Sequence, residues 1–127
     1  MDNGSAKLDW FHLVNTAATM PRQFCVGDAL VKHAAIRPQA VALEMAGRRL
    51  TYRALNRRVN QLAHALMARG IQQGDRVAIL SENCIAYLEL ELAAAKLGAI
   101  VPCINWRLKA EELQHCVRLT SPALILV

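Results

Sequence analysis

The stretch that decides the fold is residues 74–108, GDRVAILSENCIAYLELELAAAKLGAIVPCINWRL. Its pattern predicts a strand over residues 77–80, a helix over about 84–97 that ends at Gly98, and a second strand over 99–104. Both strands are continuously apolar, which is typical of strands covered on both faces. Strands that alternate with a helix on short connections predict right-handed parallel crossovers. The stretch therefore predicts an α/β fold with a parallel, helix-flanked sheet.

The residues before this stretch predict a β-hairpin between two helices. We expect a helix over residues 27–36, with Asp28 as its N-cap. Alternating side chains then predict short strands over 41–45 and 49–51, joined by a tight turn. The clearest helix of the chain is TYRALNRRVNQLAHALMARG, residues 51–70, because one apolar stripe recurs at spacings of three and four (Leu55, Val59, Leu62 and Leu66).

The C-terminal residues predict one more helix, over 109–120, and a strand that begins at residue 123. The inward face of this helix is expected to carry Leu113, Cys116, Val117 and Leu119. We expect residues 1–23 to form an N-terminal arm that is partly flexible, and residues 24–127 to form the first portion of a domain. The chain ends on the apolar strand ALILV, so we expect the domain to be incomplete, as in a truncated piece of a longer protein.

Composition limits the class of protein. Of the 127 residues, 54% are hydrophobic and 20% are charged, and the mean hydropathy is +0.20, which is a globular composition. The longest apolar run, residues 97–104, is too short to span a bilayer. Asp2, Lys7 and Asp9 lie where a signal peptide would have a basic region and an apolar core. We therefore expect a soluble, cytoplasmic protein without a transmembrane segment.

The cysteines do not indicate a metal or redox site. The chain has four, and no Cys-x-x-Cys pair or nearby pair of histidines accompanies them. Cys84 and Cys103 have apolar neighbours, so we expect both to be small buried thiols.

The formal net charge of +5 is concentrated in one place. Five arginines lie within eleven residues (Arg48, Arg49, Arg53, Arg57 and Arg58). One interpretation is a patch for phosphate or nucleic acid. The other, which we favour, is the solvated face of an amphipathic helix. We accordingly expect no nucleic-acid partner, although these arginines could still meet a phosphorylated ligand.

A polar tip follows each of two predicted strands: Asn105, Trp106 and Arg107 after one, and Ser81-Glu82-Asn83 after the other. In open α/β sheets, ligands bind beyond the carboxyl ends of the strands, so Asn105, Trp106 and Arg107 are substrate-side candidates. The planar guanidinium of Arg107 suits a phosphate or a carboxylate.

A local interpretation competes with this one and is the one we favour, because strand-end position alone does not identify a ligand. In it, Asn105 and Arg107 bond to the loop backbone and Trp106 covers the end of the sheet. Ser81 or Asn83 then caps the following helix.

Several stretches occur together in a characteristic order: ALVKHAAIRPQAVAL, LTYRALNRRVNQLAHALMARG, the stretch from residue 74 to 108, and AEEL followed by SPALILV. This ordered set resembles the N-terminal part of the adenylate-forming superfamily, the AMP-binding acyl-CoA synthetases and their relatives. The tip Asn105-Trp106-Arg107-Leu108 looks like the tip that is typical of fatty-acyl and aryl CoA ligases. Adenylation domains of peptide synthetases usually have an aspartate-proline run there, so the resemblance favours a CoA ligase.

The resemblance implies a two-step reaction in the full-length enzyme. A small carboxylic acid attacks the α-phosphate of ATP, which gives an acyl-adenylate and pyrophosphate, and the CoA thiolate then displaces AMP. ATP, Mg²⁺ and coenzyme A are the implied cofactors. The family's phosphate loop, metal-binding glutamate, ribose-binding aspartate and lid lysine have no counterparts in these 127 residues. We therefore expect no catalytic and no metal-binding residue here, and an inactive piece that holds no cofactor.

Two other functions stay open at this point. A stand-alone flavodoxin-like binding or regulatory module would also be an α/β protein of this length, but it would need clustered acidic residues at the strand ends. An adenylation domain that loads a carrier protein is the other alternative. In the ligase interpretation, the missing partner of this chain is the remainder of its own domain.

Overall fold

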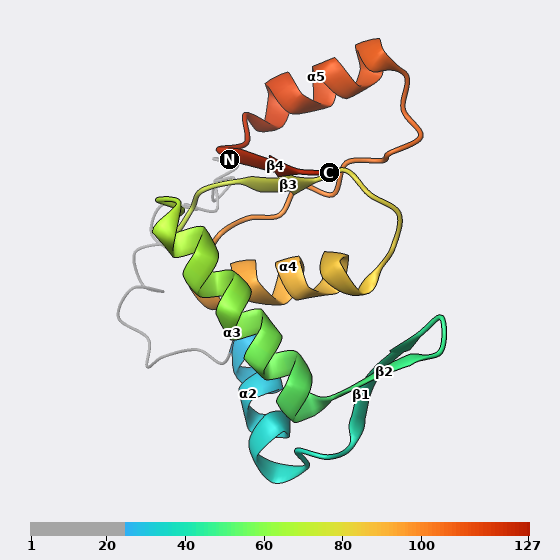
Figure 1. Ribbon diagram of the computed structural model, residues 1–127. Helices are drawn as coiled ribbons and strands as arrows, with labels where there is room; N and C mark the ends of the chain where they lie inside the picture. The colour runs from blue at the N-terminus through green and yellow to red at the C-terminus, as the bar shows by residue number, and fades with distance from the viewer. Residues whose placement is uncertain (1–24) are drawn as a thin grey trace, which may run out of the picture.

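The computed structural model describes residues 25–127, and Figure 1 draws them as a ribbon. The N-terminal arm expected over residues 1–23 lies outside the described residues. The elements follow in the order α2 (Val26–Ile36), β1 (Val41–Met45), β2 (Arg48–Thr51), α3 (Tyr52–Ala68), β3 (Val77–Ile79), α4 (Ile85–Leu97), α5 (Ala110–Thr120) and β4 (Leu124–Leu126). The chain is thus a mixed α/β protein, as its pattern predicts.

The strands form two separate pairs. β1 and β2 make the expected antiparallel hairpin, with an irregularity in register between Val41 and Leu43. β3 and β4 pair in parallel, in the register that places Val77 opposite Leu124. The predicted parallel sheet is therefore confirmed in type. Figure 1 shows α4 on one side of the β3–β4 pair and α5 on the other.

Residues 99–104, which were expected to form a strand, form only two isolated parallel bridges to the β3 region. The amide of Ile100 donates to the carbonyl of Asp75 (2.8 Å), and the Ile100 carbonyl accepts from Val77 (2.9 Å). The next donor in this ladder would be residue 102, which is a proline without an N–H. The prediction of a regular strand was wrong for this reason, although the segment still runs beside β3 and in the same direction.

The core lies where α3 and α4 meet each other and β3. Val59, Val77 and Leu90 are completely buried there, together with Ala93 of α4. The apolar stripe of α3 faces this core, as its spacing predicts. α4 is apolar on most sides because it packs against α2 and α3, and its Leu90 and Ala93 share one buried cluster with Val77 and Ile79 of β3.

Three helix details depart from the sequence predictions or refine them. Asp28 is not the N-cap of α2 but its third residue, where its carboxylate accepts from the Cys25 amide at 3.0 Å. α5 buries none of its residues, and Leu119 is 76% exposed instead of facing inward. Gly98 ends α4 with φ +72°, a left-handed conformation that suits glycine.

Candidate functional site

The two polar tips come together in one depression at the carboxyl ends of β3 and of the parallel segment 100–103. Its volume is about 480 Å³. Ser81, Glu82 and Asn83 line one side, and Asn105, Trp106 and Arg107 line the other, with Tyr87 and Cys103 between them. Both tips follow the ends of neighbouring parallel segments, which is why they lie at the same edge. We call this site the strand-end depression.

The Asn105–Arg107 tip is held by local bonds. The Asn105 side-chain oxygen accepts from the Arg107 amide at 3.0 Å, and the Leu108 amide donates to the Asn105 carbonyl at 3.2 Å. This agrees with the local interpretation for Asn105. The guanidinium of Arg107 instead lies over the Trp106 ring, 5.0 Å from its centroid, which is a cation–π contact. All three side chains are exposed, so the charge of Arg107 faces the solvent side of the depression.

The opposite side of the depression precedes α4. The predicted helix cap at Ser81 or Asn83 was wrong, because the N-cap is Cys84 and no side chain accepts a hydrogen bond there. Ser81 Oγ lies 3.9 Å from Cys84 Sγ instead. Glu82 and Asn83 are exposed, and their polar groups are available at the rim.

Tyr87 and Cys103 also line the depression, and Glu91 is close to Cys103. A hydrogen bond to Cys103 is the main cause that raises the pKa of the Tyr87 phenol to about 12, and burial and the negative charges of Cys103 and Glu91 add to it. The Cys103 thiol also lies 3.8 Å from a Glu91 oxygen. Cys103 is exposed, so the expectation of a buried thiol was wrong for this residue.

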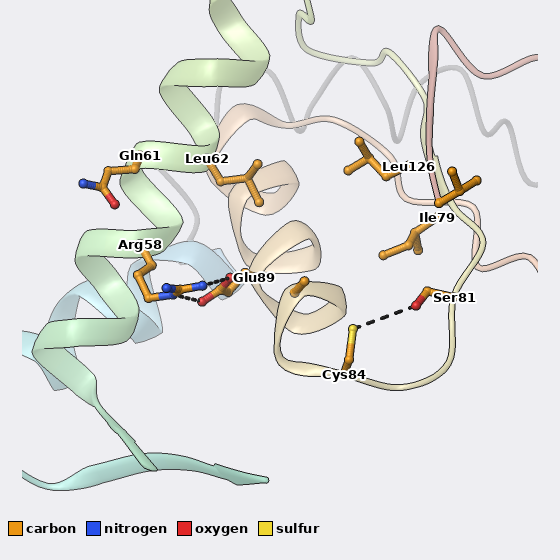
Figure 2. Close-up of a pocket in the computed structure, with 10 residues that line it drawn as sticks. Arg58, Gln61, Leu62, Ile79, Ser81, Cys84, Glu89 and Leu126 are labelled. Atoms are coloured by element: carbon orange, nitrogen blue, oxygen red, sulfur yellow. Dashed lines mark hydrogen bonds and ion pairs between the residues drawn. The ribbon is translucent and has the colours of Figure 1, made fainter. Parts of the chain in front are cut away.

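A second cleft, of about 370 Å³, adjoins the first through Ser81 (Figure 2). Figure 2 shows Arg58 of α3 reaching Glu89 of α4 at its edge, while Leu126 of β4 lies across from them. Arg58 binds the carboxylate with two nitrogens, and the Nη2–Oε2 distance is 3.0 Å. Glu89 is 6% exposed, and the hydrogen bond and charge of this carboxylate raise the pKa of Arg58.

The pair shows that one of the clustered arginines is structural. Arg49 likewise pairs with Glu44, at 3.0 Å on the exposed hairpin. Arg48, Arg53 and Arg57 are exposed, as a solvated face requires. Within residues 25–127, no group of three or more His, Cys, Asp or Glu side chains is placed to hold a metal ion.

Sequence reasoning missed Tyr87, Glu89 and Arg58 as neighbours of the site. Tyr87 lies in the first turn of α4, directly after the Ser81-Glu82-Asn83 tip, so its place in the sequence is a signal that it lies at this end of the helix. No comparable signal links Arg58 to Glu89, because they are 31 positions apart and on different helices.

The strand ends, the polar depression beyond them and the flanking helices define an α/β protein with a polar depression at its carboxyl edge. More specifically, the chain belongs to the AMP-binding enzyme family, whose model matches residues 30–127.

Three known proteins illustrate the similarity. The chain is 42% identical over 86 residues to a fatty acid–[acyl-carrier-protein] ligase of Streptomyces coeruleorubidus. This match covers 68% of this chain and 17% of that protein. The chain is 42% identical over 92 residues to a feruloyl-CoA synthase of an Amycolatopsis species, covering 72% and 19%. The crystal structure of a protein from Rhodopseudomonas palustris named as a long-chain-fatty-acid CoA ligase superposes with a TM-score of 0.79 at 38% identity, covering 82% of this chain and 26% of that one. The matched part of the chain therefore spans only about a fifth of the length of these two curated relatives.

In the part of the chain that the structure describes, no helix is both long and apolar enough to cross a membrane.

Proposed function

We propose that this chain is the N-terminal piece of an ATP-dependent acid–CoA ligase that acts on a fatty or aryl acid in the cytoplasm. The carboxylate would attack the α-phosphate of ATP, forming the acyl-adenylate and releasing pyrophosphate. The CoA thiolate would then attack the acyl carbonyl, and AMP would leave. Membership of the AMP-binding family supports this reaction, together with relatives named for acid–thiol ligation.

The strand-end depression is the substrate-side surface in this proposal. The observation that carries it is the placement of the Arg107 guanidinium, which stacks on Trp106 at the depression and forms none of the ion pairs found among the described residues. A planar, permanently charged group in this position suits a phosphate or carboxylate of a bound ligand. Asn105, whose side chain shapes the tip, and Trp106 would position Arg107.

The chemistry would come from residues outside this chain. We propose that residues 1–23 form an arm and 24–127 the first portion of the AMP-binding domain, and that the chain alone holds no ATP, Mg²⁺ or CoA and binds no nucleic acid. The remainder of the domain would pack on apolar surface beside the parallel pair, where Ile100, Ile125 and Val127 are 52%, 39% and 96% exposed.

A segment exchange tests the proposal. Residues 30–127 would replace the matching segment of the Amycolatopsis feruloyl-CoA synthase, and AMP and acyl-CoA formation would be measured over a panel of fatty and aryl acids. We expect the chimera to form acyl-CoA, the isolated 127-residue chain to form none, and Arg107→Ala to lower the activity of the chimera. Arg48→Ala, which removes an exposed arginine of the hairpin, is the matched control. A folded chimera without acid-dependent AMP release, or thioester formation by the chain alone, contradicts the proposal.

Carrier-protein loading is a second candidate, because the relative from S. coeruleorubidus is named for an acyl-carrier-protein acceptor. The same chimera distinguishes the two acceptors. Release of AMP that depends on a carrier protein and not on CoA would favour the second candidate.

A further inference from the structure

An apolar groove lies between α2, the β1–β2 hairpin, α3 and α4, away from the strand-end depression. Its volume is about 230 Å³. Val26 and Ala29 of α2 form one wall, Leu43 and Tyr52 another, and Leu88 and Leu92 of α4 lie opposite.

The wall formed by α2 is only partly covered. Four α2 residues line the groove at positions separated by three and four, so they form one face of the helix (Val26, Ala29, Leu30 and His33). Leu30 is buried at 5% exposure, but Val26 at the start of the helix is 68% exposed. This leaves an apolar surface open at the end of the groove where the chain enters α2.

The residues that precede α2 have the composition to cover this surface. Trp10, Phe11, Leu13 and Val14, which lie outside the described residues, place four apolar side chains within five positions. With Phe24, the first 24 residues contain three of the six aromatic residues of the chain. Segments that stay solvated are poor in aromatic residues, so this composition favours burial.

The length of the segment permits the contact. Val14 is eleven residues before Cys25, and an extended chain of that length reaches up to roughly 36 Å. α2 itself has 11 residues and is only about 16 Å long. A tethered segment also has a high effective concentration at the groove. A second copy of the chain would need to bury on the order of 1,200 Å² in a stable interface, far more than this small groove offers.

We propose that residues 10–14 of the same chain dock in this groove and bury Trp10 and Phe11 against α2 and α4. The inference is independent of the ligase activity proposed above.

Tryptophan fluorescence of the full 127-residue chain tests the inference. Trp106→Phe leaves Trp10 as the single tryptophan, and its emission maximum and its quenching by iodide report its exposure. We expect Trp10 to be shielded, and Val26→Asp to shift its emission to longer wavelength and to remove the protection from iodide. A negative charge at the first position of a helix interacts favourably with the positive end of the helix dipole, so this substitution should leave α2 intact. Val31→Asp is the matched control, because Val31 is 48% exposed on another face of α2.

Three outcomes overturn the inference. Trp10 is quenched as readily as free tryptophan, or it is shielded to the same extent with Asp at position 26, or its shielding is lost on dilution as a dimer dissociates in sedimentation. Circular dichroism checks the helix content, and Val26→Ser replaces Val26→Asp if the acidic variant does not fold.

Discussion

The ion pair between Arg58 and Glu89 should be the strongest single polar contribution to the packing of α3 on α4, and Arg58→Met tests this. Methionine retains most of the apolar stem and removes the guanidinium, which leaves the Glu89 carboxylate without its partner. Breaking a fully buried pair costs about 3–5 kcal/mol, and breaking an exposed one about 0.2–1 kcal/mol. The Glu89 side chain is 8% exposed and that of Arg58 is 43% exposed, so this pair lies between the two limits. We expect a loss of about 2 kcal/mol in the free energy of unfolding, up to a roughly 30-fold change in the ratio of folded to unfolded protein.

Urea denaturation followed by circular dichroism measures this loss, provided that the slope with denaturant stays the same. A double-mutant cycle with Glu89→Gln should give a coupling energy of about 1 kcal/mol or more, because the two side chains contact each other directly. The matched control is Arg49→Met, which breaks the 3.0 Å pair with Glu44 whose side chains are 66% and 53% exposed. That change should cost less than about 0.5 kcal/mol. The reasoning is refuted if Arg58→Met costs no more than Arg49→Met, or if the two losses in the cycle simply add.

Three further outcomes follow from the contacts of α4. Gly27→Ala should destabilise the protein by about 1 kcal/mol, because overpacking outweighs the better helix propensity of alanine; the added Cβ would lie 2.9 Å from the Lys96 Cγ. The same change should be close to neutral with Lys96→Ala present. Leu90→Ala should cost about 2–5 kcal/mol, since Leu90 is completely buried. Cys103→Ala should lower the pKa of Tyr87 from about 12 towards its ordinary value of 10.0, as followed by ultraviolet absorbance.

The Tyr87 shift also sets a pH dependence of stability. The folded chain holds the phenol proton more tightly than the unfolded chain does. The protonated Tyr87 therefore makes its full contribution to the free energy of unfolding below pH 10.0, and this contribution is lost as the pH rises towards about 12. Cys103→Ala should flatten this decline, and an unchanged decline would contradict the assignment. For Leu90→Ala the control is Leu119→Ala at an exposed position, where a loss above about 0.5 kcal/mol would be unexpected.

The sequence by itself determined the order and type of most elements. The helices at 26–36, 52–68, 85–97 and 110–120 and the hairpin all lie within a few residues of their predicted positions. They could be predicted because hydrophobic period, turn residues and helix-ending glycines act over a few neighbouring residues. The ordered motifs also identified the family, which the family model over residues 30–127 confirms.

The strand-end depression was predictable in part. Parallel strands bring their carboxyl ends to one edge, so Ser81 and Arg107 could be expected to face each other from sequence alone. Whether the Arg107 guanidinium bonds to backbone or stacks on Trp106 depends on rotamers that no local pattern specifies.

Only the tertiary structure decided the rest. It interrupted the predicted strand at Pro102, because the ladder to β3 needs a donor at that residue. It left Leu119 exposed, since a helical period shows which residues share a face and not whether another element covers that face. It also joined Arg58 to Glu89 and Tyr87 to Cys103, pairs that lie far apart in the sequence. Contacts of this kind depend on how the helices and strands cross, and crossing geometry follows from the whole core and not from any single segment.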